Sequence, residues 1–307
     1  MLSKIRRNRP GVLGGALVYL VLVAFELLAP REWLGIIREH GYDEVLFGDL
    51  QLRASPREKP AVIVVDIDRR TLARLGSWPW PRATMARLVG AVAAGKPKAL
   101  GMDILFAGPD PRSSAAADRG MLDVASQTLL NGDQALAQAI RSVPTALAST
   151  LETAPGPTAA TATVLRRGSI LLDDIWHQPG ANEPFPTLAA AAKGNGITSL
   201  PGDPDGKVRR VPLLVGVGTR LRPGLAVETV RVAQGASTLI VEADPQRLVV
   251  GEHSIALSFD GFLRLVPVRP VQEPARTISA IDVIEDDAKR ARLGGAIVLI
   301  GGSAPEL

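Results

Sequence analysis

The stretch AVIVVDI at residues 61–67 decides the fold class of this 307-residue chain. It is a continuous run of apolar, mostly β-branched residues, which is typical of a strand buried on both faces of a sheet. A short helix is predicted over 69–75, and apolar residues at helical spacing predict a longer one over 81–94. The stretch ALGMDIL at 99–105 predicts a second buried strand. Together these elements form a βαβ unit, for which a parallel sheet with a right-handed crossover is expected.

The rest of the chain extends this pattern. Further helices are predicted around 122–143 and over 225–233 and 278–285, and further strands over 143–150, 169–172, 208–217 and 296–300. Loops or turns are predicted at 153–163 and 203–207, and short antiparallel strands over 239–268, where Asp-Pro and Asp-Gly mark turns. The sequence therefore predicts an α/β fold whose mixed, largely parallel sheet is flanked by helices and interrupted by a β-rich inserted portion.

The N-terminus has the pattern of a membrane anchor. Residues 1–10 hold four basic residues and no acidic one, and the apolar run at 11–29 holds Glu26 as its single charge. A helix of this length spans about 28 Å, close to the hydrocarbon thickness of a bilayer. A cleaved signal peptide is the alternative, but the run is long for one and no A-x-A-like cleavage site follows it.

These features predict a topology. We expect residues 11–30 to be an uncleaved signal anchor that crosses the membrane once, with the basic tip 1–10 in the cytoplasm. Residues 31–60 are then a connecting region, and the main domain over 61–307 lies outside the cytoplasmic membrane.

Composition excludes several classes of function. The formal net charge is +4, and the basic tip accounts for all of it, so the body of the chain is neutral. A neutral body with 12 aromatic residues argues against nucleic-acid binding. The absence of cysteine excludes disulfides, cysteine-based metal sites and thiol catalysis.

Acidic and aromatic residues follow the first two predicted strands. Asp66 and Asp103 are expected near the carboxyl ends of two neighbouring parallel strands, the edge at which open α/β sheets bind ligands. Two carboxylates there could hold a cation or a polar ligand, or act as an acid/base pair. The candidate ligand-binding residues are Asp66, Asp68, Trp78, Trp80, Arg82, Asp103 and Asp110.

Each candidate also has a structural interpretation. Asp68 could cap the helix over 69–75, and Asp66 or Asp103 could pair with Arg82 to hold a loop shut. The segment WPWPR at 78–82 could be an aromatic plug over the sheet end, or it could stack on a ligand.

No catalytic set or cofactor site can be identified. The three histidines lie far apart, and the chain holds no HExxH, no phosphate-binding loop and no nucleophile elbow. The segment DPDG at 203–206 lacks the later acidic ligands of a calcium loop, so it predicts a turn and no metal site. Residues 301–303, Gly-Gly-Ser, could form an anion-binding nest of backbone N–H groups or a strand-to-helix turn.

Four segments, in this order, resemble the CHASE2 domain. They are AVIVVDIDRRTLARLGSWPWPRATMARL (61–88), KALGMDILFAGPD (98–110), GDPDGKVRRVPLL (202–214) and SAIDVIEDDAKRARLGGAIVLIGGSA (279–304), and the resemblance covers most of 45–307. Met102 stands where the family tends to show Phe, and Gly302 where a Thr or small residue is usual.

The resemblance implies a function that the residues alone do not. CHASE2 is an extracellular sensor module of bacterial signalling receptors, placed after an N-terminal membrane helix. Three further membrane helices and a cytoplasmic nucleotide cyclase or kinase usually follow, so a longer receptor is expected beyond this sequence. The resemblance thus implies a non-enzymatic sensor domain at the inner membrane. A homodimer and a small-molecule or ionic ligand of unspecified identity are expected with it.

Two other functions stay open from the sequence. One is a membrane-tethered, carboxylate-dependent hydrolase at the same strand ends, which predicts turnover of ester or phosphate substrates. The other is a purely structural dimerisation module, which predicts no pocket of ligand size.

Overall fold

The computed structural model describes residues 14–15, 17–21, 23–24, 39–45, 60–110, 132–156, 162–169, 174–203, 205–266 and 273–305. The chain divides into two compact units. The first comprises Met1–Pro56 with Gly202–Lys207, and the second comprises Arg57–Pro201 with Val208–Leu307.

In the first unit, the described residues between 14 and 24 and those at 39–45 are helical. No helix in the described part of the chain is both long and apolar enough to cross a membrane. The predicted basic tip 1–10 and much of the predicted anchor 11–30 lie outside the described residues. The predicted turn at 203–207 is confirmed, because the Gly206 N–H donates to the Asp203 carbonyl at 2.8 Å and Gly206 has a φ of +77°.

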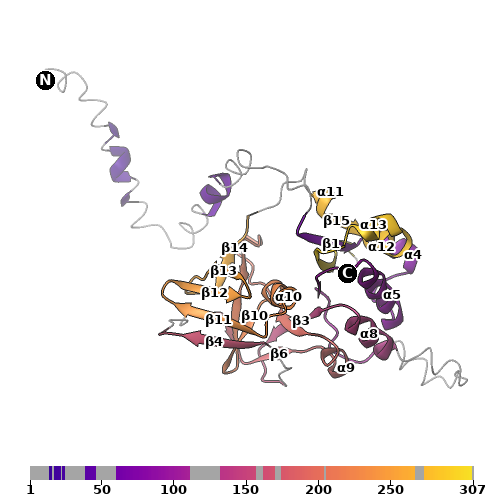
Figure 1. The fold of residues 1–307 in the computed structure, drawn as a ribbon. Coiled ribbons are helices and arrows are strands. Elements are labelled where there is room, and N and C mark those ends of the chain that lie inside the picture. Colours follow the sequence, from indigo (N-terminus) through magenta and orange to yellow (C-terminus); the bar gives the residue numbers. More distant parts are fainter. Residues whose placement is uncertain are drawn as a thin grey trace, which may run out of the picture. The chain divides into compact units, whose positions relative to one another are not determined.

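The second unit is built on a seven-stranded central sheet in the order β15-β1-β16-β2-β3, with β6 and β7 both paired to β3. Figure 1 labels four of these strands, β1, β3, β6 and β15. All of its pairs are parallel except β3 with β6, so the predicted mixed, largely parallel sheet is confirmed. The strands are β1 (Val62–Ile67), β2 (Ala99–Met102), β3 (Thr145–Glu152), β6 (Gly180–Asn182), β7 (Gly194–Ile197), β15 (Thr277–Ser279) and β16 (Ile297–Gly302).

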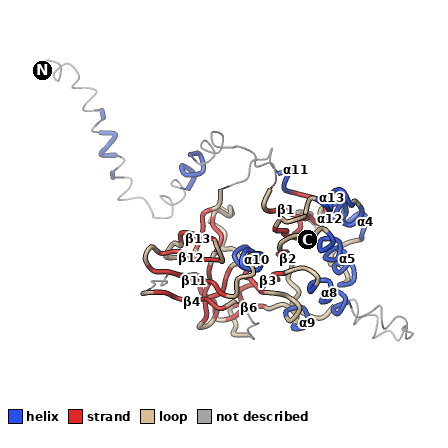
Figure 2. Tube along the Cα trace, in the orientation of Figure 1, coloured by secondary structure: helices blue, strands red, loops and turns tan. Residues whose placement is uncertain are grey.

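One face of this sheet carries the main hydrophobic core. Alternate residues of β1, namely Ile63, Val65 and Ile67, are buried against it. The apolar stripe of α5 supplies the helical side, as its predicted 3.6-residue spacing requires. The helices gathered beside the sheet in Figure 2 are α4 (Arg69–Leu75), α5 (Arg82–Ala94), α8 (Gly132–Arg141), α9 (Pro186–Ala189), α12 (Ala280–Glu285) and α13 (Asp287–Ala291).

The helix α10 (Leu225–Ala233) packs on the other face, over β2, β3 and β7. Small residues allow this approach: a Cβ added at Gly101 would lie 2.5 Å from the Thr229 Oγ1 atom. Leu225 and Val232 of α10 contact the sheet, while Val227 belongs to a second core formed with the β-rich portion. Because α10 packs against the central sheet and against the β-rich portion, it is buried on two sides.

In its described residues, the β-rich portion contains three small sheets. The four-stranded sheet comprises β4 (Thr163–Arg167), β11 (Thr238–Ala243), β12 (Gln246–Val250) and β13 (His253–Ala256). The three-stranded sheet comprises β5 (His177–Gln178), β9 (Leu214–Val217) and β10 (Arg220–Pro223), and the two-stranded sheet comprises β8 (Arg210–Pro212) and β14 (Phe262–Arg264). The predicted antiparallel pairing is confirmed for β11, β12 and β13.

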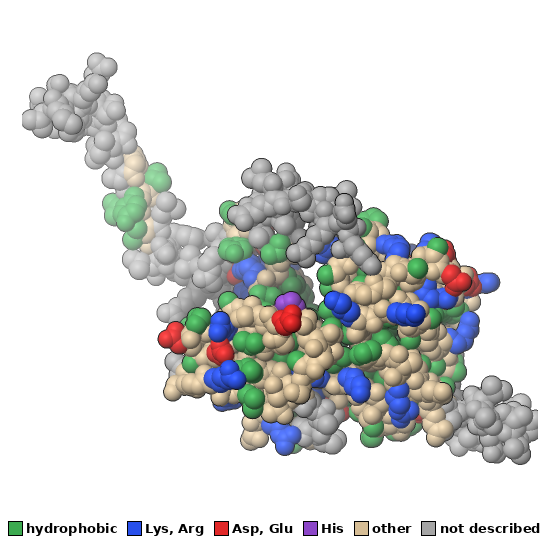
Figure 3. Space-filling view, viewed as in Figure 1, with side chains coloured by type: hydrophobic (Ala, Val, Ile, Leu, Met, Phe, Trp, Pro, Cys, Tyr) green, Lys and Arg blue, Asp and Glu red, His purple; other side chains and the backbone are tan. Residues whose placement is uncertain are grey.

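Figure 3 shows charged side chains of both signs scattered over one face of the molecule.

Several predictions of local structure were wrong in instructive ways. The strand expected over 99–105 ends at Met102, and the helix expected over 278–285 begins at Ala280 because 277–279 form strand β15. The strand β16 lies between β1 and β2, so Asp66 and Asp103 are not on neighbouring strands. Parts of the predicted helix 122–143, strand 169–172 and loop 153–163 lie outside the described residues.

Candidate ligand-binding site

Asp66 lies at the end of β1 and binds Ser303, the residue that directly follows β16. Its carboxylate accepts hydrogen bonds from the Ser303 backbone N–H at 2.9 Å and from the Ser303 hydroxyl at 2.6 Å. Gly301 and Gly302 belong to β16 itself, so they form neither the anion-binding nest nor the strand-to-helix turn that the sequence suggested. Asp66 therefore connects two neighbouring parallel strands at their carboxyl ends.

Asp68 caps α4, as one of its two interpretations predicts. Its carboxylate accepts from the Thr71 backbone N–H at 2.8 Å, the Thr71 hydroxyl at 2.7 Å and the Ser279 hydroxyl at 3.0 Å. Burial alone would raise the pKa of Asp68, but these hydrogen bonds and the charge of Arg70 outweigh it and lower that pKa below its usual value of 3.8. The carboxylate thus joins α4 to strand β15.

We expect Asp68→Ala to lower the free energy of unfolding by about 1–2 kcal/mol, because the helix loses its N-cap and Ser279 loses an acceptor. Since the folded pKa of Asp68 is depressed, its contribution is present above pH 3.8 and is lost as pH falls through the folded pKa. Urea titrations of the wild type and Asp68→Ala at several pH values measure this. An equal difference in unfolding free energy at neutral and at strongly acidic pH would contradict it.

The two tryptophans of the WPWPR segment lie against the main core. Trp80 is 5% exposed, and its indole N–H donates to the Gly76 carbonyl at 2.8 Å. Trp78 is half-buried and meets Trp80 edge-on, with ring centroids 5.5 Å apart. These contacts match the aromatic plug, and they leave a ligand-stacking role for Trp78 as a prediction.

Arg82 and Asp110 hold the start of α5. The Asp110 carboxylate, buried at 3% exposure, accepts from the Arg82 backbone N–H at 3.1 Å. The Arg82 guanidinium lies 4.3 Å from the Phe106 ring centroid and pairs with Asp133. Desolvation lowers the pKa of Arg82, although Asp133 and Asp110 act in the opposite direction. Arg82 thus pairs with Asp133 and not with Asp66 or Asp103.

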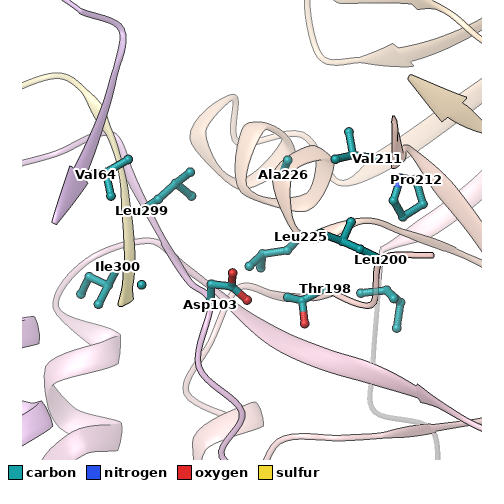
Figure 4. Close-up of a pocket in the computed structure, with 12 residues that line it drawn as sticks. Val64, Asp103, Thr198, Leu200, Val211, Pro212, Leu225, Ala226, Leu299 and Ile300 are labelled. Carbon is teal, nitrogen blue, oxygen red and sulfur yellow. The ribbon is translucent and has the colours of Figure 1, made fainter. Parts of the chain in front are cut away.

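A cavity of about 280 Å³ opens beside Asp103, near the carboxyl ends of β1, β16 and β2. In Figure 4, residues of β1 and β16 lie on one side of Asp103, and residues of β8 and of the segment after β7 lie on the other. The lining residues are Val64, Asp103, Ile197, Thr198, Leu200, Val211, Pro212, Leu225, Ala226, Leu299, Ile300 and Gly301. The cavity is therefore apolar apart from Asp103 and Thr198.

Asp103 is the one candidate from the sequence that faces this cavity. Its backbone N–H donates to the Ile300 carbonyl at 2.9 Å, which fixes the residue at the sheet end. Although the side chain is solvent accessible, the surrounding protein desolvates its carboxyl and raises the pKa of Asp103 above its usual value of 3.8. Within the described residues no group of three His, Asp or Glu side chains is placed to hold a metal ion.

We expect Asp103→Asn to stabilise the free protein at neutral pH. Because the folded pKa is raised, the wild-type carboxyl favours folding most below pH 3.8, and this contribution is lost as pH rises through the folded pKa. The advantage of the variant should therefore shrink as the solution is acidified. Melting temperatures of both proteins between pH 4 and 8 provide the measurement, and a variant that is less stable at neutral pH would disprove the expectation.

The other cavity residues were missed from the sequence. Leu200, Val211 and Leu225 are apolar residues whose spacing is that of ordinary core positions. Thr198 follows β7, a strand of Gly, Asn and Ile that has no strong strand pattern. No sequence signal distinguishes these residues, because they gather through packing of segments far apart in the chain.

Comparison with known proteins agrees with the resemblance. Searches of curated proteins and of solved structures gave no significant match. The family model described as CHASE2 domain matches residues 16–307, which include every strand of the central sheet and all the cavity residues. The chain therefore belongs to the CHASE2 family of sensor domains.

Proposed function

We propose that residues 61–307 are the extracytoplasmic sensor domain of a membrane-bound bacterial signalling receptor, and that the ligand binds in the cavity beside Asp103. The observation that carries this proposal is the CHASE2 match over 16–307. The cavity supports it, because open α/β sheets bind ligands at the carboxyl ends of their strands. Under this proposal the chain is not itself an enzyme.

The receptor context is part of the same proposal. Residues 11–30 anchor the chain in the inner membrane, the N-terminus is cytoplasmic, and the domain forms a homodimer that controls a cytoplasmic nucleotide cyclase or kinase. The basic tip followed by an apolar run supports this orientation.

The cavity walls suggest how a ligand could change the receptor's state. One wall is the central sheet, represented by Val64 and Leu299, and another is strand β8 with Val211 and Pro212. A ligand that contacts both walls at once stabilises the arrangement of the domain in which the two walls are close enough for it to do so. Only such differential binding can shift an equilibrium between two states of the receptor.

The topology can be tested directly because the chain has no cysteine. Single cysteines are introduced at Gly90, which is exposed with nothing within 4 Å of an added Cβ, and at Ser3 in the basic tip. In intact spheroplasts a membrane-impermeant maleimide should label Gly90→Cys, whereas Ser3→Cys should react only after permeabilisation. The reverse pattern would refute the proposal.

Ligand sensing is tested by a thermal-shift screen of small metabolites on the purified chain. A ligand raises the melting temperature by mass action, and filling the cavity with Gly301→Leu should abolish that rise. If no compound stabilises the chain, the structural dimerisation module becomes the better interpretation. Turnover of ester or phosphate substrates would instead favour the hydrolase.

A further inference from the structure

The cavity beside Asp103 combines an apolar wall with a single ionisable group. Asp103 is the one acidic or basic residue among its lining residues, and Thr198 supplies the other polar side chain. Binding pockets of this kind hold the body of a ligand by apolar contact and use a few polar groups to fix its orientation. The chemical class of the ligand therefore depends on which head group the Asp103 carboxyl can bind.

The Asp103 carboxyl lacks a partner in the described part of the chain. Asp66, Asp68 and Asp110 each accept hydrogen bonds from neighbouring groups, whereas no hydrogen bond or ion pair from a described residue engages the Asp103 side chain. Asp103 remains exposed, but the surrounding protein partly desolvates its carboxyl and raises its pKa, so part of the carboxylate's hydration is lost with no opposite charge beside it. A cation at this position would supply that compensation, and an anion would be repelled.

The dimensions of the cavity indicate a small ligand. Its volume of about 280 Å³ lies just below the range of about 300–1,000 Å³ that is usual for small-molecule pockets. A Cβ added at Gly301 would meet nothing closer than the Asp103 Cβ atom at 3.9 Å, so glycine leaves open the space directly beside the carboxyl. The head group of a ligand can occupy that space while its body contacts Leu225, Val211 and Leu299.

We propose that this cavity binds a small primary amine in its protonated form, with the ammonium group on the Asp103 carboxylate and a compact apolar body against the surrounding wall. The inference rests on the proposed sensory function for its biological meaning. The binding itself is a property of this chain and can be measured without the output domain.

The experiment compares three related probes on the purified full chain at pH 7.5: 3-methylbutylamine, 3-methylbutanol and 3-methylbutanoate. All three have the same branched five-carbon skeleton. The amine and the alcohol share one apolar body and differ only in the head group, whereas in the carboxylate the terminal carbon is part of the head group. Affinity is obtained by calorimetry and by the concentration dependence of the melting temperature. We expect the affinity for the amine to exceed that for the alcohol by about ten-fold or more, because a charge-assisted hydrogen bond adds to the same apolar contact. The carboxylate should bind weakest.

Variants distinguish the contribution of the Asp103 carboxyl to binding from that of the apolar cavity. Asp103→Asn should weaken amine binding about ten-fold or more and leave alcohol binding within two-fold, whereas Gly301→Leu should abolish binding of both. Glu252→Gln, an exposed carboxylate outside the cavity, is the matched control and should leave both affinities within two-fold. Amine affinity should also rise with pH as Asp103 loses its proton.

The outcomes are distinct for the two proposals. Equal affinity for the amine and the alcohol, or amine binding that survives Asp103→Asn, would overturn the amine assignment. The sensor proposal would survive that result if the metabolite screen found another ligand that Gly301→Leu excludes. Conversely, amine binding by a chain whose Gly90→Cys is shielded in spheroplasts would support the amine assignment and refute the extracytoplasmic sensor.

Discussion

Replacing Arg231 with methionine is expected to lower the free energy of unfolding by about 3–5 kcal/mol. The Glu228 side chain, which is 0% exposed, receives hydrogen bonds from two nitrogens of Arg231 at 2.8 and 2.7 Å. The Arg231 guanidinium also donates to the Lys193 carbonyl at 2.8 Å. Without the arginine, a buried carboxylate would remain with no opposite charge.

The packing around this pair prevents relaxation. A Cβ added at Gly194 of β7 would lie 1.8 Å from a Glu228 carboxylate oxygen, so α10 and the sheet are in close contact at this point. Because Leu225 and Ala226 of the same helix line the cavity, Arg231→Met should also weaken ligand binding.

Urea denaturation followed by circular dichroism measures the effect. The same replacement at Arg87, which is exposed on α5, is the matched control and should change stability by less than about 0.5 kcal/mol. The double variant Glu228→Gln with Arg231→Met should recover part of the loss, since it leaves no unpaired charge. A loss in Arg231→Met no larger than in Arg87→Met would show that the Glu228–Arg231 pair is not buried between α10 and the sheet.

Glu183→Gln should be the second strongly destabilising change, with a loss of about 3 kcal/mol. The Arg222 side chain is 2% exposed and forms an ion pair with Glu183, whose Oε2 atom also accepts from the Ser149 hydroxyl at 2.7 Å. The glutamine keeps a hydrogen bond to this network but removes its negative charge, so the Arg222 cation becomes buried without compensation.

This pair joins the three-stranded sheet to the central sheet, because Arg222 belongs to β10 and Ser149 to β3. Guanidinium chloride would screen charges, so a urea titration is the suitable measurement. Glu252→Gln serves as the exposed control, and Arg222→Met combined with Glu183→Gln should be more stable than Glu183→Gln alone. Equal stability of Glu183→Gln and Glu252→Gln would contradict the prediction.

Neither pair could be identified from the sequence. Glu228 and Arg231 are three residues apart on a helix, the spacing of an ordinary exposed ion pair. They become buried because α10 is covered by the central sheet on one side and by the β-rich portion on the other. Glu183 and Arg222 are distant in the chain and meet only after the strands have assembled.

The candidate site was predictable in part. The sequence placed Asp103 at the correct edge of the sheet, among seven candidate residues. It could not separate Asp103 from Asp66, Asp68 and Asp110, because each of these carboxylates finds a hydrogen-bond donor supplied by a different segment. Ser279 and Ser303, for example, carry no signal that they would engage an aspartate.

Local sequence by itself determined the individual elements of this protein. The β-branched run at 61–67 specified a buried strand, Asp68 specified the start of α4, and helical spacing specified α5 and α10. Such elements can be predicted because the pattern and intrinsic preferences of residues close in the chain indicate them. Tertiary structure alone decided the insertion of β16 between β1 and β2, and with it the distance between Asp66 and Asp103 and the cavity beside the latter. The physical reason is that strand order and cavity shape arise from packing between distant segments. The residue pattern within one segment does not specify which other segment it will contact.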